Sequence, residues 1–350
     1  MSRGLTFWND ETIALIREHF IAVSVPTWVA KAPGAEGDFL RQAGIDKRWV
    51  TSSGYMHCVS ASGKLLGGRP CEEVLEKFKE LPEAERRPGA VKLSPLAEAE
   101  QLIPSPPKGG LVLRVHARFL AHEKGRLRPA RPTDFPLMLA KPNVLRSWEK
   151  FLQPNTEYLW LTRDEWRAMV PAQPAKGQRL EVAPAIGLRL ARFHLTPQRA
   201  TTSEGGIVHP KRVREARMSL EVTAVSAQTI AMKLTGRVHW GSEFDAAQAT
   251  TPNGPLRQGF VAPIDGRLVY DRQRGAFTRF DLIANGHTWG RWGDANGRSM
   301  YVERPGRAPF GFALELAGDS PTDRIPPGGN GRYVTPRGYF DPPKHSKPRQ

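Results

Sequence analysis

The sequence predicts an α+β protein that begins with a mixed α/β domain and ends in an antiparallel β-sheet. Apolar and polar residues alternate in repeated runs over residues 217–317, which is the period of half-buried strands. Over residues 10–81 apolar residues recur instead at helical spacing, with short β-branched runs between them. The 33 Gly and 31 Pro residues favour many turns, and a length of 350 residues favours two or three domains.

The first 82 residues are predicted to form one domain of three helices, a strand and a hairpin. Asn9 or Asp10 is a suitable N-cap for the first helix, and Pro26 ends the apolar run that forms the strand. The hairpin turns at Ser62 and Gly63. The predicted helices cover residues 10–19, 35–43 and 70–81, the strand covers 20–25 and the hairpin covers 55–66.

This order of elements resembles the thioredoxin-like fold. The stretch Phe7–Ile13 followed by Phe20–Val25 looks like the part of such domains just after the redox helix, and Tyr55–Gly67 looks like their closing hairpin. The resemblance covers about a quarter of the chain, which as a whole is similar to bacterial multi-domain proteins. No CxxC motif is present, and Gly54 and Tyr55 replace the usual proline before the hairpin. Because thiol–disulfide exchange needs a low-pKa thiolate beside a resolving cysteine, the resemblance implies a scaffold or docking domain without redox activity.

Cys58 and Cys71 are the two cysteines of the chain. Their spacing fits neither a CxxC pair nor a zinc knuckle. We expect two buried free thiols, and the alternative is one disulfide, which requires an oxidising compartment. The N-terminus has no signal-peptide pattern, and no apolar run has the ~18 residues needed to cross a bilayer. Two localisations stay open: the cytoplasm, or export from a bacterial cell followed by removal of a signal.

Residues 83–108 are predicted to be a proline-rich linker, and residues 109–200 a basic mixed α/β region. Thr162 and Glu165 have the spacing of a capping box at the start of a short helix. His194 is expected at the C-terminal end of another helix, where the helix dipole favours an imidazolium ion. The predicted strands of this region cover residues 111–120 and 158–161, and its longer helices cover 142–152 and 184–193.

Positive charge is concentrated in residues 111–217. This segment holds 20 Lys and Arg residues against 9 Asp and Glu residues, and the whole chain has a net charge of +16. Such a concentration is one signature of a polyanion partner, which could be nucleic acid, anionic lipid or an acidic glycan. Ordinary surface solubility also explains it, since the basic residues are scattered and lack the aromatic interleaving of single-strand binding grooves.

Residues 201–318 are predicted to form an antiparallel β meander, arranged as a sandwich or a partly open barrel. A long loop, Asn285–Pro309, is expected between its last two strands. Trp240 continues an apolar stripe and is expected in the core. Residues 319–350 contain seven prolines and are expected to form a flexible basic tail. The predicted strands cover residues 218–223, 230–240, 264–270, 276–284 and 310–316.

The second and fourth of these strands end in similar short sequences, each of which contains a histidine and a tryptophan. In an up-and-down order the two strands run in the same direction, so their ends lie at one rim. Two imidazoles with nearby carboxylates could bind a divalent metal or act as general acid and base, and the tryptophans could hold a ring-shaped ligand. The candidate ligand-binding residues are His239, Glu243, His287, Trp289, Trp292 and Asp294, with His239 and His287 as candidate metal ligands.

Three classes of function remain open. The favoured hypothesis is a non-redox binding or interaction protein with a ligand or partner surface on the C-terminal β domain, since it requires no motif that the chain lacks. The second is a metal-dependent or acid–base enzyme that uses the His239/His287 rim. The third is a polyanion-binding protein that uses residues 111–217. The chain contains no GxSxG elbow, no P-loop and no glycine-rich dinucleotide-binding motif between a strand and a helix.

Overall fold

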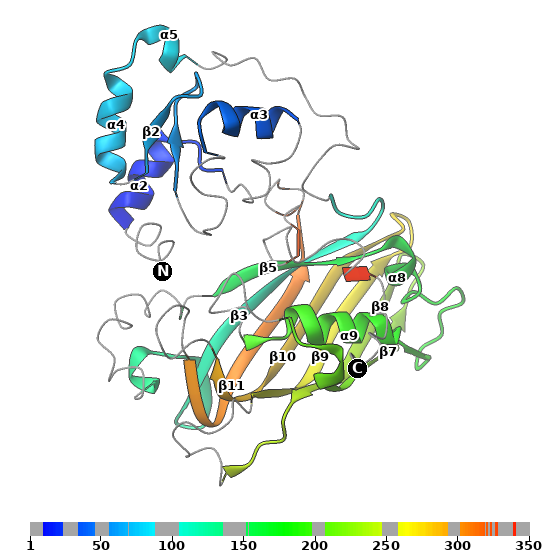
Figure 1. The fold of residues 1–350 in the computed structure, drawn as a ribbon. Helices are drawn as coiled ribbons and strands as arrows, with labels where there is room; N and C mark the ends of the chain where they lie inside the picture. The colour runs from blue at the N-terminus through cyan, green and yellow to red at the C-terminus, as the bar shows by residue number, and fades with distance from the viewer. Residues whose placement is uncertain are drawn as a thin grey trace, which may run out of the picture. The chain divides into compact units, whose positions relative to one another are not determined.

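Helices and strands are mixed in the computed structural model, and a nine-stranded antiparallel sheet dominates it, as expected for the predicted α+β class (Figure 1). The chain divides into two compact units, residues 1–103 and 104–350. None of the helices described is both long enough and apolar enough to cross a membrane. The structure describes residues 10–23, 34–45, 56–68, 70–87, 105–135, 152, 154–197, 207–246, 258–292, 302–318, 320, 323, 326–327 and 339–340.

The first unit contains short helices and a hairpin. Its described elements are α2 (Asp10–His19), α3 (Ala35–Gln42), β1 (Cys58–Val59), β2 (Leu65–Gly67), α4 (Cys71–Lys79) and α5 (Glu83–Arg86). The three predicted helices are confirmed as α2, α3 and α4. The predicted hairpin is also confirmed, since β1 and β2 pair antiparallel with Cys58 opposite Gly67.

The buried strand that was predicted to begin at Phe20 is wrong over residues 20–23. These residues belong to no strand, and Ile21 and Val23 are 94% and 73% exposed. β-Branched residues form strands where a pleated, half-buried surface is available to them, and no described segment pairs with this one. Residues 24 and 25 lie outside the described residues.

Cys58 and Cys71 are both buried, and neither forms a disulfide. Cys71 begins α4, which packs on β2 so closely that a Cβ at Gly67 would lie 3.4 Å from Val74. Burial, and to a smaller extent the neighbouring Cys71, raises the pKa of the Cys58 thiol to about 11.

The second unit is built on the large sheet. Its described strands are β3 (Leu111–Glu123), β4 (Arg126–Pro129), β5 (Asn155–Leu161), β6 (Arg179–Glu181), β7 (Val213–Val225), β8 (Thr229–Gly241), β9 (Gly259–Asp271), β10 (Ala276–Trp292) and β11 (Val302–Leu316). Its described helices are η3 (Pro132–Asp134), α8 (Arg163–Arg167), α9 (Pro184–Arg189), η4 (Leu190–His194), which is a π-helix, and η6 (Pro210–Arg212).

The sheet contains strands from two regions that were predicted to be separate. Its strands follow the order β4-β3-β11-β10-β9-β8-β7-β6, and β5 pairs with β3. Strands β7 to β11 form the predicted up-and-down meander from residues 201–318. Strands β3, β4, β5 and β6 come from residues 109–200, and β3 pairs antiparallel with β11. The two regions therefore share one sheet.

The long loop predicted over Asn285–Pro309 is wrong for most of its length. Strand β10 continues to Trp292 and β11 begins at Val302, while residues 293–301 lie outside the described residues. Gly286 interrupts the alternation of apolar and polar side chains here. The position requires glycine, because a Cβ at Gly286 would lie 2.1 Å from the carbonyl oxygen of Val261 on the neighbouring strand. The sequence shows a glycine where a large apolar side chain would mark a strand, although the backbone remains extended and paired.

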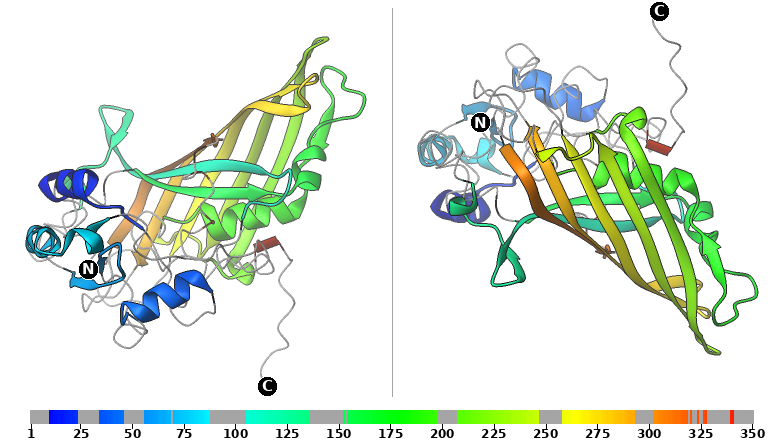
Figure 2. Two further views of the ribbon diagram at one scale, coloured as in Figure 1. Left: turned by 90° about the horizontal axis from the view of Figure 1, so that it is seen from above. Right: turned by 90° about the horizontal axis from the view of Figure 1, so that it is seen from below.

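The inner face of the sheet, defined as the face that contacts α9, carries the core (Figures 1 and 2). Helix α9 approaches β7 closely, since a Cβ at Gly187 would lie 2.3 Å from the carbonyl oxygen of Ala216. Trp240 is buried on this face and donates its indole N–H to the carbonyl oxygen of Leu195 at 2.8 Å. Its predicted place in the core is confirmed. The opposite face of the sheet is called the outer face.

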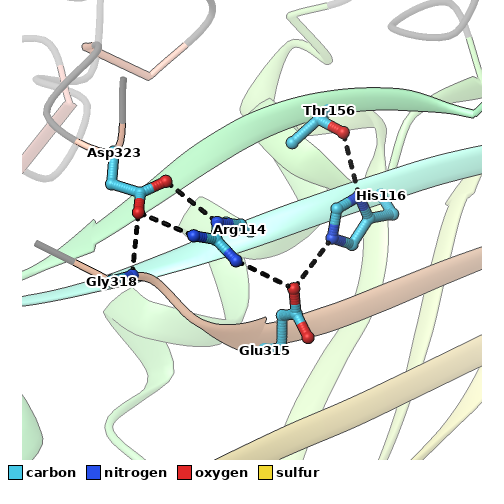
Figure 3. Close-up of polar contacts among 6 residues, drawn as sticks. All are labelled: Arg114, His116, Thr156, Glu315, Gly318 and Asp323. Atoms are coloured by element: carbon cyan, nitrogen blue, oxygen red, sulfur yellow. Dashed lines mark hydrogen bonds and ion pairs between the residues drawn. The ribbon is translucent and has the colours of Figure 1, made fainter. Parts of the chain in front are cut away.

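Two parts of the segment predicted to be a tail pack against this unit. Asp323 is buried and accepts two hydrogen bonds from the guanidinium of Arg114, at 2.9 and 2.7 Å, and a third from the backbone N–H of Gly318 at 2.8 Å (Figure 3). Arg114 also donates to Glu315 on β11. Tyr339 is the second packed part and lies in the core of the inner face.

Candidate functional site

The two histidines of the candidate site lie in one row across the outer face. His239 on β8 and His287 on β10 are both paired in register with Val261, which lies between them on β9. Residues directly opposite one another in an antiparallel sheet point to the same face. The strand order that brings their two strand ends to one rim is therefore the predicted one. We use the name outer-face cluster for His122, His239, His287, Trp289 and Arg307, which are connected by the contacts described below.

Trp289 is the most buried member of the outer-face cluster. It is paired with Gly259 on β9, where an added Cβ would lie 2.2 Å from Cζ2 of the indole. The indole also meets the edge of the Phe244 ring at a centroid distance of 5.9 Å, and the guanidinium of Arg307 lies 5.8 Å from its centroid. Trp289 is only 4% exposed. Its ring is packed against neighbours, so it offers little free surface to a ring-shaped ligand.

Two nitrogen atoms of the cluster are buried without a hydrogen-bond partner among the described residues. They are Nε2 of His239 and Nε1 of Trp289, and the two rings lie 6.3 Å apart between centroids. An indole nitrogen can only donate, whereas an imidazole nitrogen donates or accepts according to its tautomer. Leaving a buried polar atom unpaired costs about 1–3 kcal/mol. Such atoms are uncommon in folded proteins and often mark a place where a water or ligand binds.

The other half of the cluster is rich in basic groups. The rings of His122 and His287 are stacked, with their centroids 6.5 Å apart. Burial lowers the pKa of His287, and the positive charges of Arg307 and His122 lower it further. Arg307 and His122 are exposed. No described carboxylate forms an ion pair with Arg307, His122 or His287, so the described residues leave the positive charge of the Arg307 guanidinium without an acidic partner.

His239 has a different electrostatic environment. Burial is the largest cause of its lowered pKa, while Glu243, with Oε1 at 4.0 Å from the imidazole Nδ1, opposes the shift. Arg214 and Arg237 lower the pKa of His239 further. Arg214 donates to Glu243 at 3.2 Å, so this carboxylate is already shared between a guanidinium and the imidazole.

The candidate metal ligands His239 and His287 lie on strands separated by β9. Their backbones are about 10 Å apart, twice the spacing of neighbouring strands, and the side chain of Val261 points to the same face between them. No group of three or more His, Cys, Asp or Glu residues that could hold a metal ion occurs in the described part of the chain. The side chain of Trp292 and the whole of Asp294 lie outside the described residues.

A second polar network, which the sequence did not predict, lies on the inner face. His194 is 0% exposed, and its Nδ1 lies 3.1 Å from Oε1 of Glu157 on β5. Its Nε2 forms a hydrogen bond with the hydroxyl of Tyr339. His194 is thus at a helix end, as expected, but it is enclosed between a carboxylate and a phenol. The only sequence signal was the aromatic pair Tyr339 and Phe340 within a segment of prolines, glycines and basic residues.

Arg189 of α9 connects this network to the start of α8. Its guanidinium donates to both carboxylate oxygens of Glu165, at 2.8 and 2.5 Å, and its Nε donates to the backbone carbonyl oxygen of Tyr339 at 3.0 Å. The same guanidinium lies 4.6 Å from the centroid of the Phe340 ring. Burial opposes ionisation of Glu165, but hydrogen bonds from Arg189 and Thr162 outweigh it and lower the pKa of the carboxyl. This network connects α8 and α9 to residues 339–340, and we interpret it as a structural rather than a ligand-binding network.

Comparison with known proteins adds no relative to this description: no family model, no curated protein and no solved structure matches the chain. The structural class of the protein therefore follows from its fold and from the arrangement of the site. It is an α+β protein with a nine-stranded antiparallel sheet, one helix-covered face and an outer-face cluster of three histidines, a tryptophan and an arginine.

Proposed function

We propose that the chain is a non-redox binding protein and that the outer-face cluster of its second unit is the ligand surface. The observation that best supports this is the pair of buried nitrogens, Nε2 of His239 and Nε1 of Trp289, which lack a hydrogen-bond partner among the described residues. A ligand that accepts a hydrogen bond from the indole would remove a cost of about 1–3 kcal/mol. The exposed Arg307 and His122 give such a ligand a point of first contact.

In this proposal residues 1–82 act as a thioredoxin-like scaffold or docking domain without redox activity. The high pKa of the Cys58 thiol supports that role, because a pKa of about 11 keeps the sulfur protonated near neutral pH. Thiol–disulfide exchange requires the thiolate. Cys58 is also buried, which hinders attack by an external disulfide.

The test follows the indole N–H resonances of the nine tryptophans in ¹⁵N-labelled protein. A Trp289→Phe variant assigns the Trp289 resonance by its loss. Sodium phosphate, sodium acetate, N-acetylglucosamine and zinc chloride are then added separately at millimolar concentration. We expect at least one of these probes to shift the Trp289 resonance in a saturable way.

Two other tryptophans serve as internal controls. Trp240 already donates to Leu195, and Trp160 on β5 has a buried unpaired Nε1 that does not belong to the cluster. Their resonances should stay in place when the Trp289 resonance moves. If no probe moves the Trp289 resonance, or if all three resonances move together, the outer-face cluster is not the ligand surface.

A further inference from the structure

We infer that the outer-face cluster binds an oxyanion, which is a carboxylate or a phosphate group carried by the ligand. This inference rests on the proposed function and specifies the chemistry of its ligand. The contacts would come from Arg307, His122 and His287, with the indole N–H of Trp289 and the imidazole of His239 as further donors.

The contacts of the cluster form a continuous set from β3 to β8. His122 on β3 stacks on His287 of β10, and Arg307 of β11 is close enough to lower the pKa of His287. Arg307 also lies over Trp289, whose ring is 6.3 Å from that of His239. Cationic and N–H groups from four strands therefore share one region of the outer face, and each can serve as a hydrogen-bond donor.

The charges of this region favour an anion. Two described carboxylates near cluster residues in the sequence are already engaged, since Glu123 lies 3.0 Å from Nε of Arg128 and Glu243 accepts from Arg214. Arg307 has no described acidic partner. Its guanidinium lies over the ring of Trp289 in a cation–π interaction. A guanidinium presents several N–H groups in a plane that matches carboxylate and phosphate oxygens.

The packing of Trp289 argues against ligands recognised by ring stacking. Its indole lies over Gly259 and against Phe244, and the residue is 4% exposed. The indole N–H of Trp289 is buried and has no hydrogen-bond partner among the described residues, and it can only donate. An oxyanion supplies several acceptor oxygens at once, so it could satisfy this donor together with an imidazole or the guanidinium.

The experiment compares Arg307→Gln with a matched control on the same face of the sheet. Arg267 on β9 is also exposed and has no described ion pair, so Arg267→Gln removes an equal charge outside the cluster. Phosphate and acetate are titrated separately at constant ionic strength, with the Trp289 indole resonance as the readout. We expect both probes to shift that resonance in the wild-type protein. Arg307→Gln should weaken binding about tenfold or more, the loss expected for one charge-assisted hydrogen bond, while Arg267→Gln changes it less than about twofold.

A second comparison separates two sources of the same chemistry. Vesicles of phosphatidylserine in phosphatidylcholine are tested against vesicles of phosphatidylcholine alone by sedimentation. Co-sedimentation with the anionic vesicles that Arg307→Gln weakens would identify a lipid headgroup as the source of the oxyanion. Binding of free phosphate or acetate without co-sedimentation would identify a soluble ligand, and either result supports the inference.

The outcomes also separate this inference from the proposed function. If only N-acetylglucosamine or zinc shifts the Trp289 resonance, the cluster binds a ligand but the oxyanion is wrong. If Arg307→Gln and Arg267→Gln weaken phosphate binding equally, the effect is general surface charge and the inference fails. If none of the probes shifts the resonance, both proposals fail. A His122→Gln variant repeats the comparison at the other exposed position, so the result does not depend on the folding of one variant.

Discussion

Trp289 occupies its position because the residue opposite it has no side chain. The indole lies where a Cβ at Gly259 would be, at 2.2 Å from Cζ2. This explains the glycine at the start of β9, which is paired with both neighbouring strands and where glycine otherwise weakens the sheet. Sequence reasoning placed Trp289 in the candidate site but in a loop with an available ring face. The neighbouring glycine, which decides how the ring packs, is 30 residues away in the sequence.

Gly259→Ala is predicted to displace the indole and to lower the free energy of unfolding by about 1–3 kcal/mol, the usual cost of an extra methyl group in a packed site. The Trp289 indole resonance should also move. Urea unfolding followed by circular dichroism measures the stability. Gly306→Ala is the matched control, because a Cβ at Gly306 meets no atom within 4 Å. Equal stability of the two variants would show that the indole does not lie over Gly259.

His287 is predicted to make stability depend on pH. Its pKa in the folded protein is lowered by burial, Arg307 and His122, so the unfolded chain takes up a proton more readily than the folded one. The free energy of unfolding should therefore fall as the pH drops through the ordinary histidine value of about 6.5 and level off below the folded pKa. Urea unfolding at several values between about pH 8 and pH 5 measures this slope.

A His287→Gln variant isolates that contribution. Glutamine keeps a polar side chain but does not titrate, so the fall in stability between these pH values should be smaller than in the wild-type protein. His239, whose pKa is also lowered chiefly by burial, should retain its own part of the slope. Identical slopes for the wild type and His287→Gln would contradict the lowered pKa of His287.

At the scale of elements, the capping box at α8 shows what a local sequence pattern can predict and what it cannot. Thr162 accepts from the backbone N–H of Glu165 at 3.2 Å, and the Glu165 carboxylate accepts from the backbone N–H of Thr162 at 2.9 Å, as the spacing predicted. The same carboxylate is also the partner of Arg189, which is 3% exposed. No local pattern indicated this second role, because the two residues are brought together by the packing of α8 and α9.

Glu165→Gln is predicted to lower the free energy of unfolding by about 2–3 kcal/mol, since it removes the charge that compensates a buried guanidinium and part of that cost is screened by solvent. Thr162→Ala is the comparison: it removes one half of the capping box and should cost about 1 kcal/mol. Thermal and urea unfolding of both variants test this order. A loss at Glu165→Gln no larger than that at Thr162→Ala would mean that the Arg189 pair contributes nothing.

Within the large sheet, strand prediction succeeded where large apolar residues alternate with polar ones, and it failed over the second half of β10, where two glycines interrupt that alternation. The runs in β7, β8 and the first part of β10 were predicted because large apolar residues alternate with polar ones. The second half of β10 was predicted as a loop because Gly286 and Gly290 carry no side chain to mark a face. Close approach of neighbouring backbones is a property of the assembled sheet, so the sequence gives no direct sign of it.

For the whole molecule, the C-terminal segment behaves differently from a simple tail. Tyr339 is 3% exposed and its hydroxyl contacts His194, while its carbonyl oxygen accepts from Arg189. Asp323 is held by Arg114 from the other end of the second unit's sequence, 209 residues away. Through these contacts, Asp323 and Tyr339 are part of the folded structure of this unit.

Truncation after residue 338 is predicted to destabilise the second unit by about 3–5 kcal/mol, the cost of removing a large buried aromatic side chain. It would also leave His194 and Arg189 without two of their partners. Truncation after residue 340 is the control, since it keeps Tyr339 and Phe340. Thermal unfolding of the two truncated proteins measures the difference, and equal midpoints would show that Tyr339 does not lock the network.

The sequence by itself determined the α+β class, most of the helices, the five-strand meander and the two histidines at one rim. These features follow from the period of apolar residues, from caps and from turn residues, all of which act over a few neighbouring positions. Only the tertiary structure decided that β3 continues the meander beside β11, that Gly259 makes room for Trp289 and that Tyr339 reaches His194. Those outcomes depend on which distant surfaces exclude water together, and a local pattern records which face of a strand is apolar but not what will cover it.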